Sequence, residues 1–441
     1  MPTTFRPYQP DQSWLLPPSP QDWLSEGHLA FFISETVDSL DLSVLYERYE
    51  GDGRRNQPFD PRMMVKVLVY AYATGTFSSR RIARKLEEDV AYRVLAAGNF
   101  PSHRTLCDFR QQHLEAFGQF FVQVVQIARE AGLIRLGTLV VDGSKVKANA
   151  SKHKAMSYSR MLEEEKRLRT QIADLTARAA TLDAQEDAEH GDAVRGDELP
   201  EELQRREKRL RKIQEAKARL EARQAEADRA RGRSEDDERK SSKGGGRGRF
   251  ARDFGTPPDT AQDNFTDPES RIMKTSSGFE QCYNGQVAVD EESQLIVSSV
   301  LTDSAADYGQ LIGVLDRAKA SLGADPQQVL ADAGYKSEET FNLLEQRGID
   351  AFISLGREGK SIKEPKTDLP TTMRITEKLT GETGRKRYRR RKAVVEPVFG
   401  WIKHVLGFRS FHLRGLEKVR GEWELICLAV NLKRCHVLLA S

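Results

Sequence analysis

Short apolar runs that end in an acidic residue place the strongest constraint on how this chain can fold. Residues 138–141 are rich in β-forming side chains and lead directly into Asp142. Val329 and Leu330 form a second apolar strand end, which Asp332 follows closely. Because Asp is common where strands end in turns, each aspartate has an ordinary structural explanation. The alternative is that each strand carries one carboxylate of a metal site.

Composition sets limits on the class of protein. The chain has 441 residues, 38% of them hydrophobic, which is enough for a sizeable core spread over about three domains. The mean hydropathy of −0.59 is low for a compact enzyme, so part of the chain must be strongly solvated. No apolar run is long enough for a membrane span and no signal-peptide pattern is present, so we expect a cytoplasmic protein without a membrane partner. The four cysteines form no CxxC pair, and we interpret them as reduced core residues.

The first part of the chain predicts an extended tail followed by a helical domain. Residues 1–25 are Pro-rich, and residues 26–130 have helical patterns throughout, with Asp60 and Pro61 as one clear helix start. Short helices joined by tight turns are typical of helix-turn-helix-like DNA-binding domains. Arginines on one of these helices are candidate DNA contacts: Arg80, Arg81 and Arg84. A plain helical bundle with a basic outer surface explains the same pattern.

Residues 154–230 predict an inserted antiparallel coiled-coil hairpin. Apolar residues recur there at heptad spacing in two segments separated by a polar loop. They are Met161, Leu168, Ile172, Leu175, Ala179 and Leu182, then Leu203, Leu210, Ile213, Leu220 and Ala227. Residues 231–254 are basic and Gly-rich, which is typical of a flexible linker. We expect the hairpin to serve interaction between protomers or along DNA; a passive spacer is the alternative.

The remaining sequence predicts an α/β fold, a mixed sheet with flanking helices. Strand patterns alternate with helical ones, and they join the earlier strand at 138–141. The later strands are expected at 283–290, 294–303, 327–335 and 350–355. The insertion therefore splits this domain into residues 131–153 and 255–441.

Three carboxylates are candidates for a metal site. If the strands are neighbours, Asp142 and Asp332 lie close together, and like charges at that distance require a cation. Oxygen ligands favour Mg²⁺ or Mn²⁺. Glu396, on a largely apolar segment flanked by cations, is the third candidate. Competing acidic residues are interpreted as a turn residue, a loop end and a helix cap: Asp267, Asp303 and Asp307.

The segment around Glu396 is strongly basic, although the net charge of the chain is only +3. Within residues 385–420 the only acidic side chains are Glu396 and Glu417. Such a run indicates a polyanionic partner, and a solvated charged surface explains it equally well. Trp401 is expected in the core, with stacking on an unpaired base as the alternative.

Four stretches together resemble bacterial insertion-sequence transposases of the DDE type, and the resemblance runs essentially end to end. They are "VVDGSKVKANAS", "NFTDPESRIMKTSSGFEQCYNGQVAVD", "VLADAGYKSEE" and "VVEPVFGWIKHVLGFRSFHLRGLEKVRGEWELICLAVNL". The resemblance implies an RNase H-like catalytic domain in which Asp142, Asp332 and Glu396 are the catalytic, metal-binding triad for two Mg²⁺ or Mn²⁺ ions. It also implies double-stranded DNA as partner, both terminal inverted repeats and target DNA, and hence a nucleoid-associated protein that is a homodimer on DNA ends.

Many such transposases carry a Tyr–Arg–Glu–Lys pattern around the glutamate. Lys403 matches the Lys place, so the resemblance implies a contact to a transposon-end phosphate. The Arg place holds Lys392 and the Tyr place holds Arg389, with Tyr388 one residue out of register. The other DNA-binding candidates in the basic run are Arg391, Arg409 and Arg414.

The expected function is therefore a DNA transposase that cleaves at insertion-sequence ends and joins the 3′-OH to target DNA. Two metal ions suit such a phosphodiester transesterification, which needs no covalent protein intermediate. Two alternatives stay open: a metal-dependent DNA nuclease of the same fold, and a non-catalytic DNA-binding regulator derived from a transposase.

Overall fold

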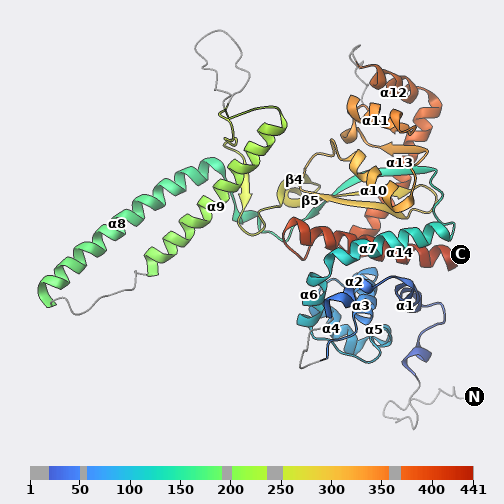
Figure 1. The fold of residues 1–441 in the computed structure, drawn as a ribbon, viewed down its shortest axis with the longest axis horizontal. Helices are drawn as coiled ribbons and strands as arrows, with labels where there is room; N and C mark the ends of the chain where they lie inside the picture. Colours follow the sequence, from blue (N-terminus) through green and yellow to red (C-terminus); the bar gives the residue numbers. More distant parts are fainter. Residues whose placement is uncertain (1–18, 50–56, 191–200, 236–251, 357–368, 441) are drawn as a thin grey trace, which may run out of the picture.

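The computed structural model describes residues 19–49, 57–190, 201–235, 252–356 and 369–440 (Figure 1). Most of the expected N-terminal tail, the hairpin loop and most of the Gly-rich linker lie outside these residues. No helix in the described part of the chain is long and apolar enough to cross a membrane.

The N-terminal region is helical, as predicted. Its helices are α1 (Leu29–Ser39), α2 (Ser43–Tyr46), α3 (Pro61–Ala73), α4 (Ser79–Glu88), α5 (Val90–Leu95), α6 (His103–Gln112) and α7 (Leu114–Glu130). The predicted start of α3 is confirmed, because the Asp60 carboxylate accepts a hydrogen bond from the Arg62 backbone N–H at 2.7 Å. This helix ends just before Gly75, whose φ of +74° suits glycine.

The central sheet has the mixed topology that the sequence predicted. Its strands are β1 (Thr138–Lys147), β4 (Arg271–Thr275), β5 (Gly278–Asp290), β6 (Ile296–Thr302), β7 (Gln328–Ala331) and β8 (Asp350–Ile353). They are ordered β4-β5-β1-β7-β8, and β6 also pairs with β5. Strands β1, β7 and β8 are parallel, whereas β5 is antiparallel to its three neighbours. This order is consistent with the RNase H-like sheet that the resemblance implies.

Helices of the second half cover the sheet and connect it to the helical domain. They are α10 (Leu311–Leu322), α11 (Glu338–Gln346), α12 (Pro370–Thr380), α13 (Glu382–Gly400) and α14 (Leu416–Ala440). Helix α13 packs on β1 and β8, while α14 contacts β6, α7 and α3 (Figure 1). Because α14 packs on elements of both parts, one continuous hydrophobic core spans the helical domain and the sheet.

Two long helices project from this body, α8 (Tyr158–His190) and α9 (Glu201–Ala230) (Figure 1). A small sheet of β2 (Ala155–Ser157) and β3 (Gln262–Asn264) lies at their base. Near this base the two helices pack through apolar side chains of the expected heptad positions: Met161, Leu168, Ile213 and Leu220. Farther out, Ile172 and Leu175 are only half-buried, and Ala179 and Leu182 lie outside the described side chains. A coiled coil therefore remains a prediction.

Candidate active site around Asp142 and Asp332

The sheet register brings Asp142 and Asp332 to the same place. Val141 pairs with Ala331 in the parallel ladder of β1 and β7, and each aspartate is the next residue in its chain. The prediction that neighbouring strands carry the two carboxylates is confirmed. The prediction that the first strand ends before Asp142 is wrong, because β1 keeps pairing with β5 as far as Lys147.

Asp142 carries a charge that its surroundings do not fully balance. Burial raises the pKa of its carboxyl to about 6. The Arg391 guanidinium, 2.7 Å from Asp142 Oδ2, opposes this effect, whereas the nearby carboxylates of Asp332 and Asp307 add to it. The other oxygen, Oδ1, accepts a hydrogen bond from the Gly143 N–H at 2.8 Å.

Asp332 lies half-buried at the start of a short 3₁₀ turn, Ala333–Tyr335. Its Oδ1 accepts a hydrogen bond from the Gly334 N–H at 2.8 Å. This turn fixes the direction of the carboxylate immediately after β7. The position of Asp332 is therefore compatible both with a turn residue and with a ligand of a metal site.

Asp307 also lies at this place, and the helix-cap interpretation of it is wrong. Helix α10 begins at Leu311, and the residue before it makes no side-chain cap. Instead, Asp307 Oδ1 accepts hydrogen bonds from Asn284 Nδ2 at 2.8 Å and Gln286 Nε2 at 2.6 Å. Both donors lie on the buried strand β5, and buried polar side chains need hydrogen-bond partners. Two polar residues at alternate positions of this apolar run therefore indicated in the sequence that a polar partner such as Asp307 packs against it.

The other two competing aspartates have structural partners. Asp303 forms an ion pair with Arg271 at 2.6 Å. Asp267 is buried and accepts a hydrogen bond from the Tyr283 hydroxyl at 2.9 Å. These contacts account for both carboxylates without a metal ion.

Glu396 is not brought to the two aspartates. It lies exposed on α13, five residues after Arg391, which is about 140° around the helix. Since Arg391 points to Asp142, Glu396 points to a different side. Within the described ranges, no three His, Cys, Asp or Glu side chains are close enough to hold a metal ion. The incompletely balanced pair of Asp142 and Asp332 fits a divalent cation, whereas a site that includes Glu396 requires a change in α13.

The predicted DNA-binding residues divide into inward-facing and exposed groups. Arg391 is buried against Asp142, and Lys403 donates hydrogen bonds from Nζ to Ser144 Oγ and Lys145 O at 2.6 and 2.7 Å. Burial lowers the pKa of Lys403. The exposed group consists of Arg80, Arg81, Arg84, Arg389, Lys392, Arg409 and Arg414.

The core interpretation of Trp401 is wrong. This side chain is 40% exposed at the start of a π-helical turn, Trp401–Val405, and Lys433 Nζ lies 5.4 Å from the ring centroid. On this turn Ile402 is the side chain that is buried in the core.

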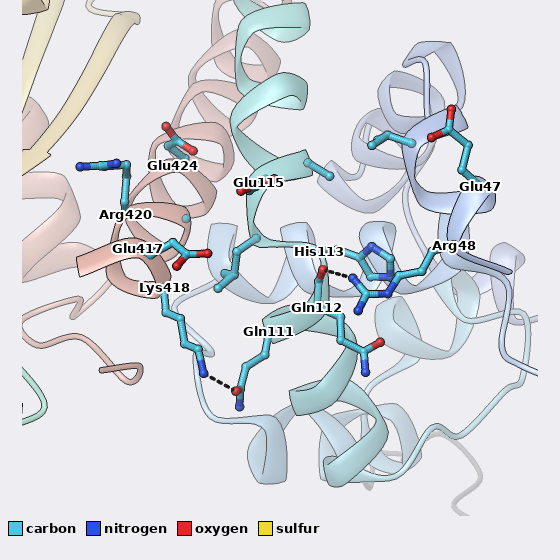
Figure 2. A pocket seen from close by; sticks show the side chains of 14 residues that line it. Glu47, Arg48, Gln111, Gln112, His113, Glu115, Glu417, Lys418, Arg420 and Glu424 are labelled. Atoms are coloured by element: carbon cyan, nitrogen blue, oxygen red, sulfur yellow. Dashed lines mark hydrogen bonds between the residues drawn. The ribbon is translucent and has the colours of Figure 1, made fainter. Parts of the chain in front are cut away.

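A cavity of about 680 Å³ lies between the helical domain and α14, away from the aspartates. Figure 2 shows charged side chains of both signs around it; Lys418 points to Gln111, with 3.4 Å between Nζ and Oε1. Arg48 donates a hydrogen bond to the Gln112 carbonyl at 2.9 Å. None of its lining residues is a predicted site residue, so the carboxylate group remains the candidate active site.

Two family models match parts of the chain. A family model described as a transposase DDE domain matches residues 252–432, and one described as a transposase domain (DUF772) matches residues 18–112. No curated protein and no solved structure matched the chain. The first range contains Asp332 and Glu396, and the second covers most of the helical domain. The two matches thus identify the chain as an insertion-sequence DDE transposase, a class that acts on DNA with nuclease or transferase activity in general.

Proposed function

We propose that this protein cleaves DNA at insertion-sequence ends and joins the resulting 3′-OH to target DNA by transesterification. The observation that carries the proposal is the placement of Asp142 and Asp332 at one point of the sheet, in a chain whose family acts on DNA. Carboxylates that hold metal ions suit in-line displacement at phosphorus, which needs no Ser, Tyr or Cys nucleophile.

The proposed metal ligands are Asp142, Asp332 and Glu396, with Mg²⁺ or Mn²⁺ as the ions. DDE transposase domains normally use divalent metal ions. Two such ions, when bound, activate the attacking oxygen and stabilise the leaving oxygen. The incompletely balanced charge of Asp142 supports a cation there, and oxygen donors favour hard ions. Glu396 is included because of the sequence pattern around it. In the structure it is exposed on α13, on a different side of the helix from Arg391, which contacts Asp142.

The chain's own residues position and neutralise DNA in this proposal. Exposed arginines on α4, on α13 and in the segment after α13 would neutralise backbone phosphates. Each such contact steepens the salt dependence of binding by about 0.9 on a log–log plot. These arginines are Arg80, Arg81, Arg84, Arg389, Arg409 and Arg414. Lys403 would support the strand segment after Asp142 through its bonds to Ser144 and Lys145. Two ends must be joined, so a homodimer on DNA is part of the proposal.

A second candidate is a DNA-binding regulator derived from a transposase. The observations that favour it are the Arg391–Asp142 ion pair and the exposed position of Glu396. In that case the acidic residues would be remnants without a catalytic role.

The test is a strand-transfer assay with purified protein, Mg²⁺ and a duplex that carries the element's end. We expect cleaved and joined products from the natural protein, and neither product from Asp142→Asn, Asp332→Asn or Glu396→Gln, with DNA binding retained. Asp303→Asn is the matched control, because that carboxylate pairs with Arg271. Cleavage without joining would indicate the nuclease, and binding without either reaction would indicate the regulator. Retained cleavage in one variant would remove that residue from the site.

A further inference from the structure

We propose that Asp307 is a further carboxylate of the Asp142–Asp332 site, and that with the side-chain oxygen of Asn284 it helps to bind a divalent cation there. In the arrangement described, the three carboxylates are not close enough to hold an ion, so the proposal includes that they draw together when a cation binds. The inference rests on the proposed function and names a ligand that the triad of Asp142, Asp332 and Glu396 does not include. Three observations carry it: the space that two glycines leave beside Asp307, the buried Asn284 oxygen without a hydrogen-bond partner, and the hydrogen bonds that fix one oxygen of Asp307.

Two glycines let Asp307 approach both aspartates. A Cβ on Gly143, the residue after Asp142, would lie 2.7 Å from Asp307 Oδ1. A Cβ on Gly334, two residues after Asp332, would lie 3.2 Å from Asp307 Oδ2 and 3.0 Å from Asp332 Oδ1. A real Cβ atom does not lie within 2.7 Å of an oxygen. Asp307 Oδ1 therefore occupies space beside residue 143 that only a glycine leaves free.

Asn284 supplies an observation that is independent of the acidic residues. Its side chain is fully buried on β5, and its Oδ1 has no hydrogen-bond partner among the described residues. This oxygen would lie 2.9 Å from a Cβ on Gly143, so it faces the same space as Asp307. An unpaired buried amide oxygen costs about 1–3 kcal/mol, which a cation or its bound water would offset.

The two oxygens of Asp307 have different surroundings. Oδ1 receives hydrogen bonds from Asn284 and Gln286 and an ion pair from Lys145 Nζ at 3.3 Å. Oδ2 has no such partner in the described part of the chain and faces Gly334 and Asp332. One oxygen therefore fixes the direction of the carboxylate and the other is presented to the site, as expected for a ligand held by a supporting shell.

A hydrogen-bond chain couples Asp307 to the turn that carries Asp332. Gln286 donates to Asp307 through Nε2 and accepts a hydrogen bond from the Tyr335 hydroxyl through Oε1. Tyr335 closes the 3₁₀ turn that begins after Asp332. Two side-chain hydrogen bonds thus link Asp307 to the turn after Asp332, and in the arrangement described Arg391 pairs with Asp142 alone.

The test measures binding of Mn²⁺ to the full chain without DNA, from the free-ion signal in electron paramagnetic resonance. We expect Asp307→Asn, which keeps the shape and removes the charge, to weaken binding by on the order of tenfold. Asp307→Glu should restore most of the affinity, and Asp303→Asn should bind as the natural protein does. Asp142→Asn, which should also bind weakly, shows that the measured ion is at this site. Equal affinity of Asp307→Asn and the natural protein would overturn the inference.

A second measurement needs no variant. Fe²⁺ bound in place of Mn²⁺, with ascorbate and peroxide, cuts the backbone next to the ion. Cuts at the segments of Asp142, Asp307 and Asp332 are expected; cuts that spare the Asp307 segment would refute its part. Neither readout uses DNA. A protein that binds Mn²⁺ through Asp307 and yet cleaves no DNA would contradict the proposed function and leave this inference standing.

Discussion

At the scale of single residues, Arg391 determines the charge of the site before any cation binds. Arg391→Gln should lower the free energy of unfolding of the metal-free protein by about 1–3 kcal/mol, because it leaves Asp142 buried without a counter-charge. The same change should tighten Mn²⁺ binding, since a competing cation is removed. Urea unfolding and Mn²⁺ titration measure the two effects. Arg389→Gln, an exposed position of the same helix, is the control. Weaker Mn²⁺ binding would show that Arg391 instead orients Asp142.

His113 predicts a pH dependence of stability outside the site. Burial lowers the pKa of this imidazole to about 4, with the Arg48 charge acting in the same direction. Between pH 6.5 and 4 the unfolded chain therefore binds the proton more tightly than the folded one. The contribution of His113 to the free energy of unfolding is therefore complete above pH 6.5. It is lost as the pH falls toward 4, and the loss is at most about 3 kcal/mol.

His113→Gln should remove this contribution. The difference in unfolding free energy between pH 7.5 and pH 4.5 should then be smaller in the variant than in the natural protein. His153, which is exposed, provides the control in His153→Gln. An unchanged pH difference in the His113 variant would show that its imidazole is solvated.

At the scale of elements, the contact between α7 and α14 depends on glycine. A Cβ on Gly421 would lie 2.5 Å from Leu114 Cβ and 3.0 Å from Leu114 O. Gly421→Ala should therefore destabilise the protein by about 1–3 kcal/mol, because the helices must separate. Gly313→Ala on α10, where a Cβ meets nothing within 4 Å, should stabilise it by up to about 1 kcal/mol through helix propensity. Thermal unfolding of both variants measures these effects. If Gly421→Ala left the stability unchanged, the two helices would be able to separate without cost.

The base of the projecting helices depends on Asp263. This buried carboxylate of β3 accepts hydrogen bonds from Arg219, at 2.7 Å from Nη2, and from Arg223, both on α9. Asp263→Asn leaves two cations without a full counter-charge, at a cost of about 1.5–3 kcal/mol for each charged hydrogen bond that is weakened. We expect faster trypsin cleavage within α8 and α9 and unchanged cleavage of the body. The exposed Arg229–Glu235 pair gives the control, Glu235→Gln. Equal rates of digestion of Asp263→Asn and Glu235→Gln would show that Asp263 does not hold α9 at the base.

At the scale of the whole molecule, the helical domain and the sheet form one body. Fully buried Glu422 of α14 accepts hydrogen bonds from the Tyr72 hydroxyl of α3 at 3.1 Å and from the His412 backbone N–H at 2.9 Å. Helix α14 also lies against the sheet through Asn431, which accepts a hydrogen bond from the Ile296 N–H at 2.9 Å. The sheet that carries the candidate site is therefore packed against the helical domain through α14, and α7 adds direct contacts to α10 and β6.

The projecting helices belong to the body only at their base. Deletion of residues 161–229, with a short Gly-Ser connection, should leave the thermal transition of the body in place. Because the helices are expected to serve interaction, the deletion should also impair joining of DNA ends. Calorimetry and the strand-transfer assay measure the two results. Loss of the body's transition would show that the helices are structural, and unaffected joining would refute their interaction role.

Much of the secondary structure was predictable, because its signals are local. The helix expected to start at Asp60 and Pro61 does so, since the Asp60 carboxylate accepts hydrogen bonds from the backbone N–H groups of Arg62 and Met63. Alternating strand and helix patterns predicted the mixed sheet. The aspartates after neighbouring strands predicted half of the candidate site, because parallel register follows once β1 and β7 are adjacent.

The rest of the site was decided by tertiary structure alone. The rotation of α13 about its axis places Arg391 against Asp142 and leaves Glu396 exposed, and that rotation depends on which apolar face packs on the sheet. Asp307 reaches the site from a loop after β6, held by polar side chains of β5 that are distant in sequence. Local sequence thus determined where helices and strands form, whereas long-range packing determined which charges meet, because charge contacts depend on register and helix rotation rather than on spacing along the chain.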